Sequence, residues 1–443
     1  MPAFADTLDT AVRQAVAQEL IGTAQPVVGL LDLNAVEERI AALTGAFAPA
    51  GQVLHTVACK AVTLVPVLRF LAERGLGCEV ASPGEYAMAQ AAGFPAERIV
   101  LDSPAKTEGE LRRALGDGAS LNIDSYQEME RVDALLGELA GASAESAAGP
   151  ASVIGVRVNP VVGAGSIGQM STATTTTKFG VPLVDAADQD RLIAAIRARP
   201  HITQLHVHTG SQGIPLELAA AGIRRVVELA DAINDAAGQQ QIARIDMGGG
   251  LSVNFLSDDI TPTFEDYADV LKREVPGLLD GRYGLVTEFG RALLAKAGTI
   301  ATRIEYTKTV GSRRFAIGHA GAQTATRTAF VPEHWPLRIS ARTADGAPSP
   351  APSAIQDLAG PCCFTGDMIG RDYDVPEFQP GDIALIHDVG AYYFSTPFAY
   401  NALPRIPVYA YRAAAEARVE FALVRRQQTV EELLAEAGED VVL

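Results

Sequence analysis

Cysteines and long apolar runs are scarce in this chain of 443 residues, and each shortage excludes a class of protein. The four cysteines lack metal-ligand spacing, and Cys362 and Cys363 are adjacent, which argues for reduced thiols and against a disulfide framework. Nowhere do about 18 uncharged apolar residues run together, so we expect no membrane span. Residues 1–20 show neither the basic region nor the apolar core of a secretion signal. A cytoplasmic protein is therefore expected.

Positive charge is also in short supply. The chain has 36 lysines and arginines against 53 acidic residues, its formal net charge is −17, and only six of the basic residues are lysines. Binding to nucleic acid relies on a basic surface, so we expect a small-molecule substrate and no nucleic-acid partner. A hydrophobic content of 48% supplies enough apolar material for more than one domain.

What the chain has in quantity is an alternation of short β-branched runs and amphipathic stretches, the pattern of repeated βα units. After an opening run at 26–32, eight strands are predicted near 54–59, 77–82, 99–102, 120–124, 152–159, 202–209, 243–248 and 284–289. Stretches long enough for crossover helices lie at 64–74, 107–115, 126–140, 216–236 and 264–275. Eight such units predict an α/β fold with a (β/α)8 barrel of roughly 250 residues.

The pattern changes near residue 296, where strand-like alternation continues without long helices, as in 313–319, 382–388 and 406–411. We therefore predict two domains. The first is the barrel over 26–295, and the second is a mostly β domain made of 1–25 together with 296–443.

Two polar loops interrupt these patterns. The loop at 341–353 is rich in proline, alanine and serine, which is typical of a connection without chemical function. The loop at 163–177 is rich in glycine and threonine. It is either a flexible surface loop or a lid on the substrate side of the barrel.

Polar residues at the carboxyl ends of the strands build the active site of such a barrel. Here those positions hold Lys60, Glu79, Asp102, Asp124, Arg157, His208, the glycine turn at 248–250 and Glu288. Lys60 closes an otherwise apolar strand, and burial would lower its pKa and leave more neutral amine to condense with an aldehyde. The alternative is a lysine that extends from the rim into solvent.

Glycine turns after the last two strands indicate a phosphate site. Gly248-Gly249-Gly250 follows the seventh strand and Gly290-Arg291 the eighth, where barrels often hold a phosphate on backbone N–H groups. Ser211 could add a hydroxyl to that site, and His208 could face a cofactor ring or be an ordinary core histidine.

Glu288 ends the last strand, where its carboxylate could keep a pyridine nitrogen protonated. The alternative is a structural ion pair with Arg157 or Arg291. An amine for an aldehyde, a phosphate site and a carboxylate for a ring nitrogen together indicate pyridoxal phosphate (PLP).

In the second domain, the turn GPCCFTGD at 360–367 combines thiols with an acid. A thiol beside Asp367 could protonate a carbanion, although small buried cysteines are more often structural.

Taken in order, these motifs resemble those of the fold-type III PLP decarboxylases, the family of diaminopimelate, ornithine and arginine decarboxylases. The resemblance covers about 26–412, and its motifs are HTVACKAV, EVASPGE, LDSPAKT, RVNP, KFG, HTGSQ, DMGGG, EFGR and GPCCFTGD. The chain departs from the family at Val62, where asparagine is usual, and at Phe289, which replaces a proline.

The resemblance implies a role for each matching residue. Lys60 takes the Schiff-base position, His208 stacks on the ring, and Cys363, not Cys362, is the catalytic thiol. The implied catalytic residues are Lys60, His208, Glu288, Cys363 and Asp367. The implied cofactor contacts are Lys60, Glu79, Arg157, His208, Ser211, Gly249, Gly250, Glu288, Gly290, Arg291 and Tyr392. Cys363 and Asp367 would reach the active site of the other subunit of a head-to-tail homodimer, and no metal is expected.

The departures concern the substrate. Phe364 stands where diaminopimelate decarboxylases have glutamate and ornithine decarboxylases have aspartate, the acid that engages the distal ammonium. An aromatic ring cannot accept those hydrogen bonds, so a simple distal ammonium is disfavoured. Arg327 keeps the position of a substrate-binding arginine, and Phe364 and Tyr392 complete the implied substrate site. The segment 318–336 is similar to the branch that decarboxylates citryl-amino acid intermediates in siderophore assembly.

The resulting hypothesis is that CO2 leaves the α-carbon of an amino acid and that Cys363, helped by Asp367, delivers the proton that replaces it. Three alternatives stay open. The chain could be a diaminopimelate decarboxylase with an altered pocket, a non-catalytic homologue that regulates a partner protein, or a racemase or dehydratase on a related PLP barrel.

Overall fold

The computed structural model describes residues 4–142, 152–414 and 418–441, and the chain divides into two compact units. We call them the barrel unit (40–253 and 261–293) and the sheet unit (1–39, 254–260 and 294–443). Among the described helices, none has the length and apolar character needed to cross a bilayer.

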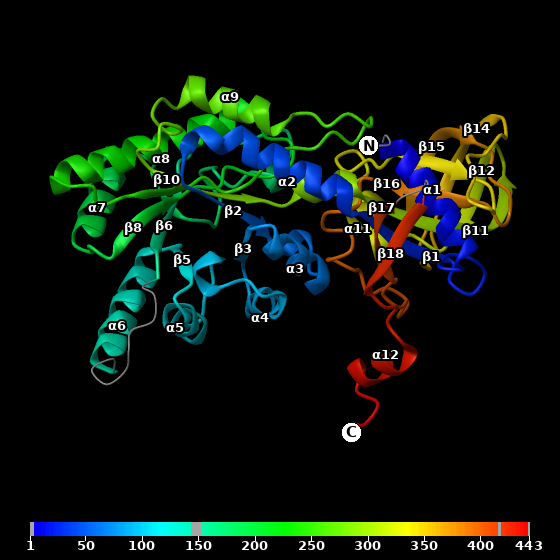
Figure 1. Ribbon diagram of the computed structural model, residues 1–443, viewed down its shortest axis with the longest axis horizontal. Helices are drawn as coiled ribbons and strands as arrows, with labels where there is room; N and C mark the ends of the chain where they lie inside the picture. Colours follow the sequence, from blue (N-terminus) through cyan, green and yellow to red (C-terminus); the bar gives the residue numbers. More distant parts are fainter. Residues whose placement is uncertain (1–3, 143–151, 415–417, 442–443) are drawn as a thin grey trace. The chain divides into compact units, whose positions relative to one another are not determined.

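The barrel unit contains a closed ring of eight parallel strands, drawn from blue to green in Figure 1. The strands are β2 (Val53–Ala58), β3 (Gly77–Val80), β4 (Ile99–Asp102), β5 (Ser120–Ile123), β6 (Ile154–Asn159), β8 (Ile202–His206), β9 (Arg244–Asp246) and β10 (Gly284–Phe289). The ring closes because β10 pairs with β2 and β5 pairs with β6. The short strand β7 (Val181–Pro182) pairs in parallel with the end of β6. The predicted (β/α)8 barrel and its eight strands are confirmed.

Helices follow these strands. They are α3 (Val65–Glu73), α4 (Pro83–Ala92), α5 (Glu108–Asp117), α6 (Tyr126–Ala142), α7 (Ala186–Arg197), α8 (Leu216–Ala237), α9 (Phe264–Glu274) and α10 (Arg291–Leu294), while α2 (Leu33–Phe47) begins in the sheet unit. Helices α4, α5, α7 and α9 each begin at a residue whose side chain caps the first turn. Thr107 and Glu110 form a capping box at the start of α5, and Gly118 ends that helix in the left-handed conformation that glycine tolerates best.

The bore of the barrel is polar at its centre. Gln204 Nε2 donates to Asn122 Oδ1 at 2.8 Å, and Asn122 Nδ2 donates to Asp246 Oδ2 at 3.2 Å. These three side chains come from β8, β5 and β9, and all are fully buried. A Cβ on Gly155 in β6 would overlap the Asn122 amide, so a glycine makes room for this chain of hydrogen bonds.

The sheet unit is built on nine strands, most of them antiparallel to a neighbour. They are β1 (Val27–Asp32), β11 (Gly298–Val310), β12 (Arg313–Gly318), β13 (Ile339–Arg342), β14 (Ser353–Ala359), β15 (Met368–Pro376), β16 (Ile383–His387), β17 (Val408–Ala414) and β18 (Arg418–Arg425). The long strand β11 pairs with β1, β12 and β16. Of the described helices, α1 (Phe4–Ala17), α11 (Ala322–Phe330) and α12 (Val430–Glu436) lie wholly in this unit. The predicted β-rich second part of the chain is confirmed.

The opening run at 26–32 does not join the barrel, although the predicted barrel began at residue 26. As strand β1 it pairs antiparallel with β11 and parallel with β17, and all six of its residues are buried. Val28 and Leu30 pack in a core with Leu8 and Val12 of α1. Because a strand buried on both faces has the same apolar sequence in either kind of sheet, the run alone could not reveal its partners.

The loop at 163–177 is bound to the segment after β8. Thr172 N donates to Thr209 O and Ser166 N donates to Gly213 O, each at 2.9 Å, and Ser171 forms a β-bridge with Gly210. The loop includes the 3-10 turn Gly168–Met170. It therefore lies directly beside Ser211, one of the residues predicted to serve a phosphate.

Candidate active site

Lys60 and Glu79 face each other at the ends of neighbouring strands. Lys60 lies in the 3-10 turn Cys59–Ala61 after β2, and its Nζ donates to Glu79 Oε1 and Oε2 at 2.9 and 2.7 Å. The side chain of Glu79 is 1% exposed and that of Lys60 is 47% exposed. The expectation of a buried amine is therefore wrong for Lys60, because the buried side chain of this pair is that of Glu79. Burial raises the pKa of Glu79, and the charge of Lys60 opposes that rise.

Arg157 in β6 lies between two aspartates at the strand ends. Its Nη1 is 2.7 Å from Asp102 Oδ2, and its Nε is 4.0 Å from Asp124 Oδ1. Burial works against the ionised form of Asp102, but nearby positive charges, with Arg157 first among them, outweigh it and lower the pKa. Burial raises the pKa of Asp124 to about 6, despite the nearby guanidinium. The ring of Phe179 stacks against Arg157, with 4.4 Å between Cζ and the centroid. Arg157 thus forms part of a buried ion network.

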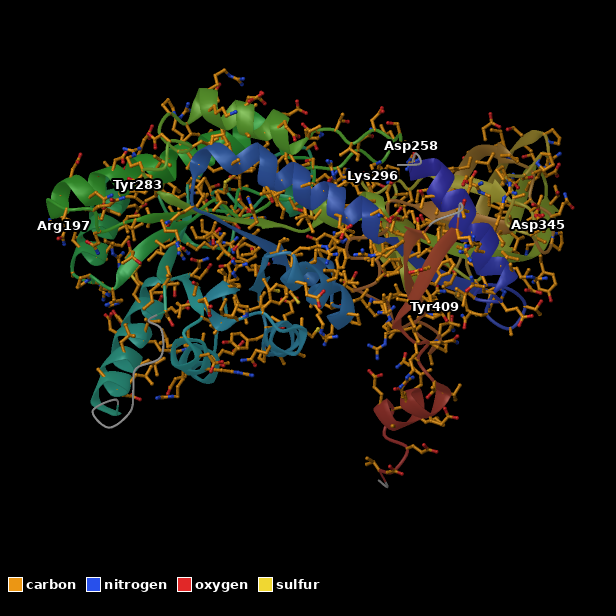
Figure 2. All side chains as sticks on the ribbon, in the orientation of Figure 1. Arg197, Asp258, Tyr283, Lys296, Asp345 and Tyr409 are labelled. Atoms are coloured by element: carbon orange, nitrogen blue, oxygen red, sulfur yellow. The ribbon has the colours of Figure 1, made fainter. Side chains whose placement is uncertain are left out.

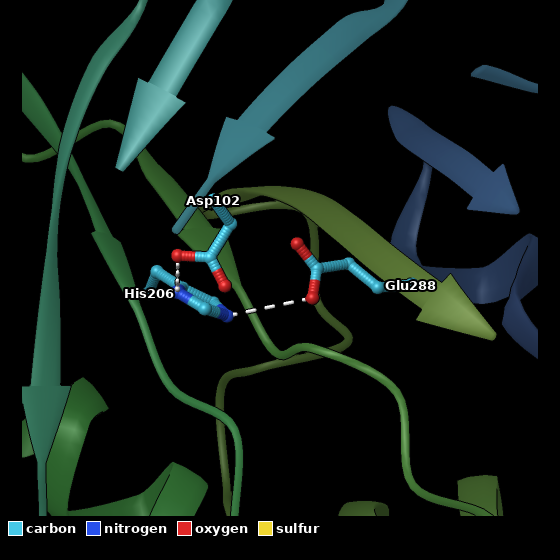
Figure 3. Close-up of side chains that lie close together, drawn as sticks. All are labelled: Asp102, His206 and Glu288. Carbon is cyan, nitrogen blue, oxygen red and sulfur yellow. Dashed lines mark ion pairs between the residues drawn. The ribbon is translucent and has the colours of Figure 1, made fainter. Parts of the chain in front are cut away.

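Glu288 ends β10 and is almost fully buried. Its Oε1 has no hydrogen-bond partner among the described residues, and its Oε2 lies 3.5 Å from His206 Nε2 (Figure 3). Burial, reinforced by the charges of Glu79 and Asp102, raises the pKa of Glu288 well above its ordinary value. The structural alternative, a direct ion pair of Glu288 with Arg157 or Arg291, does not occur among the described salt bridges.

His206 is the site residue that the sequence reasoning missed. It lies in β8, is fully buried, and its Nδ1 is 3.6 Å from Asp102 Oδ1. The signal was present, because His206 precedes His208 by two residues and side chains two apart in a strand point to the same side.

His208 lies next to the glycine turn. Gly249 N donates to His208 Nδ1 at 3.2 Å. Burial, followed by the charges of Arg157 and Lys60, lowers the pKa of His208 well below its ordinary value. The ring is therefore neutral near pH 7, with Nδ1 as the acceptor.

The predicted phosphate residues of the barrel unit come together at one place. Arg291 Nη2 lies 3.5 Å from Ser211 Oγ. A Cβ on Gly249 would overlap the carbonyl oxygen of Glu288, and one on Gly250 would overlap that of Gly210. Gly250 also has a φ of +101°, which side chains rarely adopt. A Cβ on Gly290 would press on Ala61, the residue after Lys60. Only glycines fit these turns, which leaves their backbone open to a phosphate.

The remaining predicted residues belong to the sheet unit. Cys363 is exposed, and its backbone N–H donates to Asn401 Oδ1 at 2.8 Å. Cys362 is buried, and burial raises the pKa of its thiol to about 11. Of the two adjacent thiols, Cys363 is thus the one that a substrate could reach.

Phe364 lies in a cluster of aromatic rings. Its ring is parallel to that of Phe330, with centroids 5.4 Å apart and an interplanar angle of 10°. The ring of Tyr400 lies 5.0 Å away at 60°, and Phe398 packs against both Phe330 and Tyr400. Phe364 is held by neighbours in its own unit, so it presents a preformed apolar surface.

Arg327 in α11 is flanked by two aromatic rings. Its Cζ lies 4.9 Å from the centroid of Trp335 and 5.1 Å from that of Tyr392. Its Nη1 is buried and makes no hydrogen bond among the described residues. The structure thus brings Arg327 and Tyr392 together, as predicted for a substrate site.

Comparisons with known proteins decide the family. Residues 33–295 match the model of the pyridoxal-dependent decarboxylases, pyridoxal binding domain. The chain belongs to the pyridoxal-dependent decarboxylases. It is similar to the diaminopimelate decarboxylase of Pseudomonas aeruginosa, with 33% identity over 85% of both chains. It is also similar to that of Methanothermobacter thermautotrophicus, with 31% identity over 85% of this chain and 83% of the relative.

Solved structures support the same assignment. The diaminopimelate decarboxylase of Helicobacter pylori, complexed with L-lysine, superposes on this decarboxylase with a TM-score of 0.81 at 25% identity, covering 96% of this chain and all of the other. This chain is therefore an enzyme, an amino acid decarboxylase that uses PLP. The expectations of a PLP decarboxylase and of its cofactor are confirmed, and the alternative of a non-catalytic homologue is wrong.

The residues of this decarboxylase fit PLP. The buried Glu288 Oε1 offers an acceptor that no described residue uses, as a pyridine N–H requires. The turn at 248–250 is made of glycines that no larger residue could replace, and Ser211 and Arg291 lie together. The amine of Lys60 is accessible and oriented by Glu79.

Proposed function

We propose that this decarboxylase removes the α-carboxylate of an amino acid that carries a second carboxylate at its distal end, with diaminopimelate as the first candidate. One observation carries this proposal: Arg327 is flanked by Trp335 and Tyr392 and keeps a buried Nη1 without a hydrogen bond among the described residues. A guanidinium held in this way suits a planar carboxylate. Relatives named diaminopimelate decarboxylase support the same substrate class.

Within this proposal, the barrel unit holds the cofactor. Lys60 binds it covalently, Glu79 orients the amine, His208 stacks on the ring and Glu288 accepts from the ring nitrogen. The phosphate contacts are Ser211, Gly249, Gly250, Gly290, Arg291 and Tyr392. The bound cofactor draws electron density from the α-carbon as CO2 leaves. Arg157 supports the site through Asp102.

The proton that replaces CO2 comes from Cys363, in this proposal, and the thiol belongs to the other subunit of a head-to-tail homodimer. The exposed position of Cys363 on the sheet unit suits a group that acts on a neighbour. A mixture of Lys60→Ala and Cys363→Ala chains tests the sharing of sites. Heterodimers form half of a random mixture and hold one intact site of two, so about a quarter of full activity should return. A mixture as inactive as its two parents would contradict shared sites.

A second candidate substrate is a citryl-amino acid of siderophore assembly. It is favoured by Phe364, which lies parallel to Phe330 and offers no acceptor for a distal ammonium. Diaminopimelate carries both a distal carboxylate and a distal ammonium, whereas a citryl-amino acid offers carboxylates and no such ammonium. The two candidates therefore differ in whether a distal ammonium must be bound without an acceptor at Phe364.

The deciding experiment is a CO2-release assay with diaminopimelate, lysine, ornithine and a citryl-amino acid. We expect turnover only where a distal carboxylate is present. Arg327→Gln should raise KM for that substrate about tenfold or more, because a buried charge-assisted hydrogen bond is lost. Arg314→Gln, an exposed arginine of the same unit, is the matched control. A preference for lysine or ornithine would contradict the proposal of a substrate with a distal carboxylate.

A further inference from the structure

His206 lies between two buried carboxylates on opposite sides of its ring (Figure 3). Nδ1 is 3.6 Å from Asp102 Oδ1, and Nε2 is 3.5 Å from Glu288 Oε2. Neither ring nitrogen has a hydrogen-bond partner among the described residues, and the side chain is fully buried. Buried polar atoms normally have partners, so this arrangement needs an explanation.

The two carboxylates differ in charge. Asp102 is 2.7 Å from Arg157, and the charge of Arg157 keeps the pKa of Asp102 low despite burial. Glu288 has no such cation in contact, and burial raises its pKa well above the ordinary value. These surroundings favour the protonated form of Glu288 beside the ionised form of Asp102. A protonated Glu288 could not serve as the anionic acceptor that a pyridinium requires.

We propose that His206 is a positioning residue that takes up the proton of Glu288 at Nε2, while Asp102 stabilises the resulting imidazolium through Nδ1–H. The O–H bond of Glu288 breaks and an N–H bond of His206 forms, so the total charge of the pair is unchanged. Glu288 becomes the anion that faces the ring nitrogen of the cofactor. The inference rests on the proposed role of Glu288.

Among the residues that the structure describes, the other acids near Glu288 are less suited to take this proton. Glu79 is committed to the ammonium of Lys60. Asp246 of β9 is itself an acid whose two oxygens accept from Asn122 and from Gly248 N.

Further charges also surround His206. His208 carries a pKa lowered by burial and by Arg157, so it stays neutral, and Arg157 is engaged by Asp102. Asp246 interacts electrostatically with both His206 and Glu288. The ionised Asp102 on the far side of the ring is thus the group that would stabilise a positive imidazole, the same arrangement by which a buried carboxylate orients a histidine base.

A metal ion is the competing explanation, because the ligand atoms of Asp102, His206 and Glu288 lie within 4.8 Å of one another. The two carboxylates, however, approach different nitrogens of one ring. A single ion can bind only one of these nitrogens, so the geometry favours proton transfer. Elemental analysis of the purified holoenzyme after dialysis against a chelator separates the two. One equivalent of tightly bound metal would overturn the relay.

The test of the relay uses His206→Gln and His206→Asn. The glutamine amide nitrogen lies near the place of Nε2 and can still donate to Glu288, whereas the asparagine amide nitrogen lies near Nδ1 and reaches only Asp102. Neither amide can accept the proton. We expect kcat to fall about tenfold or more in both variants with KM little changed, and the loss to be smaller for His206→Gln.

The visible absorption of the bound cofactor is the second readout. In the wild type it should stay constant between about pH 6 and 8, whereas in both variants it should change with pH, because Glu288 then titrates with solvent. Far-UV circular dichroism and the thermal midpoint establish that each variant folds, and His201→Gln, a partly exposed histidine of the same unit, is the control.

The outcomes distinguish a failure of the relay from a failure of the proposed role of Glu288. If Glu288→Gln alters the spectrum but folded His206 variants keep the wild-type pH profile and kcat, the relay is wrong and the role of Glu288 stands. If Glu288→Gln leaves the spectrum unchanged, the proposed role of Glu288 fails and the relay fails with it.

Discussion

The backbone N–H of Cys362 donates a hydrogen bond to Asp367 Oδ2 at 2.5 Å. The other oxygen of Asp367 accepts from Ala322 N, also at 2.5 Å, and a Cβ on Gly321 or Gly360 would overlap this carboxylate. Both oxygens are thus engaged by backbone. This geometry favours a role for Asp367 in shaping the turn that carries Cys363, the proposed proton donor, in addition to the predicted help in proton transfer.

Asp367→Asn should therefore destabilise the sheet unit. An amide offers one acceptor oxygen and one NH2 group, so one of the two buried backbone N–H groups loses its partner, at a cost of about 1–3 kcal/mol. Urea denaturation measures the loss. Asp345→Asn, at an exposed turn of the same unit (Figure 2), is the control and should change stability by less than about 0.5 kcal/mol. Equal effects of the two variants would contradict the assigned role.

Lys60→Arg tests the cofactor linkage without removing the charge beside Glu79. Arginine keeps the ion pair but cannot supply a neutral amine, because its pKa is too high. We expect the purified variant to fold, to lack the visible band of the bound cofactor and to release no CO2. Borohydride reduction followed by peptide mapping should label wild-type protein at Lys60. Lys272→Arg, on the surface of α9, should behave as wild type, and labelling of Lys60→Arg at another lysine would refute the assignment.

Phe364→Glu places an acid directly after Cys363 and removes the ring contacts with Phe330 and Tyr400. Each aromatic pair contributes about 0.5–1.5 kcal/mol, so a loss of about 1–3 kcal/mol is expected. The acid can pair with a distal ammonium, so CO2 release from lysine, which should be at background in the wild type, should rise at least about tenfold above that background. Phe364→Leu removes the ring without adding charge and should not show this gain. An equal gain in lysine turnover in both variants would show that the loss of the ring, and not the added charge, causes it.

Asp388→Asn probes a buried ion cluster in the sheet unit that the sequence did not reveal. Asp388 is 1% exposed and accepts from Arg338 Nη2 at 3.0 Å and from Lys296 Nζ at 3.2 Å. Asparagine keeps the volume and tolerates the positive φ of 66°, but removes the buried negative charge that Arg338 and Lys296 share. A loss of about 3 kcal/mol is expected in urea denaturation.

Asp258 provides the matched control for that cluster. It also pairs with Arg338, at 2.5 Å, but its side chain is 83% exposed, and it lies near Lys296 (Figure 2). Exposed ion pairs contribute about 0–1 kcal/mol, so Asp258→Asn should be nearly neutral. Comparable losses from Asp258→Asn and Asp388→Asn would show that burial does not determine the energy of this cluster.

The eight barrel strands could be predicted because each is a short apolar run followed by a helix-period stretch, a pattern that depends on local sequence. Strand β1 could not be assigned in the same way, because its partners β11 and β17 come from distant parts of the chain. Helices α4 and α7 were not among the stretches named from the sequence, although Ser82 with Pro83 and Asp185 are ordinary start signals.

Some features of the site could likewise be predicted from the sequence, and others could not. Lys60, Arg157 and Glu288 could be predicted because strand ends meet at one rim of a barrel. The pairing of Lys60 with Glu79 and the placement of His206 between two carboxylates depend on side-chain directions around a closed ring, which a linear sequence does not state. The engagement of Asp367 by backbone amides likewise depends on a turn whose shape only the fold determines.

Asp246 should make the barrel unit less stable as pH rises. Burial raises the pKa of Asp246 to about 8. An aspartate of an unfolded chain titrates near 3.9, so the folded state holds a proton that the unfolded state releases between about pH 4 and 8. This contribution to the free energy of unfolding is complete below about pH 4 and is lost as pH rises through about 8, at up to about 1.4 kcal/mol per pH unit.

Asp246→Asn removes this dependence, because an amide stays neutral. Its Oδ1 can keep the bond from Gly248 N, and its NH2 group can be accommodated if the amides of Asn122 and Gln204 both flip, since Gln204 Oε1 has no hydrogen-bond partner among the described residues. We expect the stability of the variant relative to wild type, measured by urea denaturation from pH 5 to 9, to increase with pH and level off above about pH 8. Asp259→Asn, on the surface, should show no such trend. A difference between Asp246→Asn and wild type that stays constant with pH would mean that Asp246 is ionised throughout, and the polar bore would then need a cation to balance it.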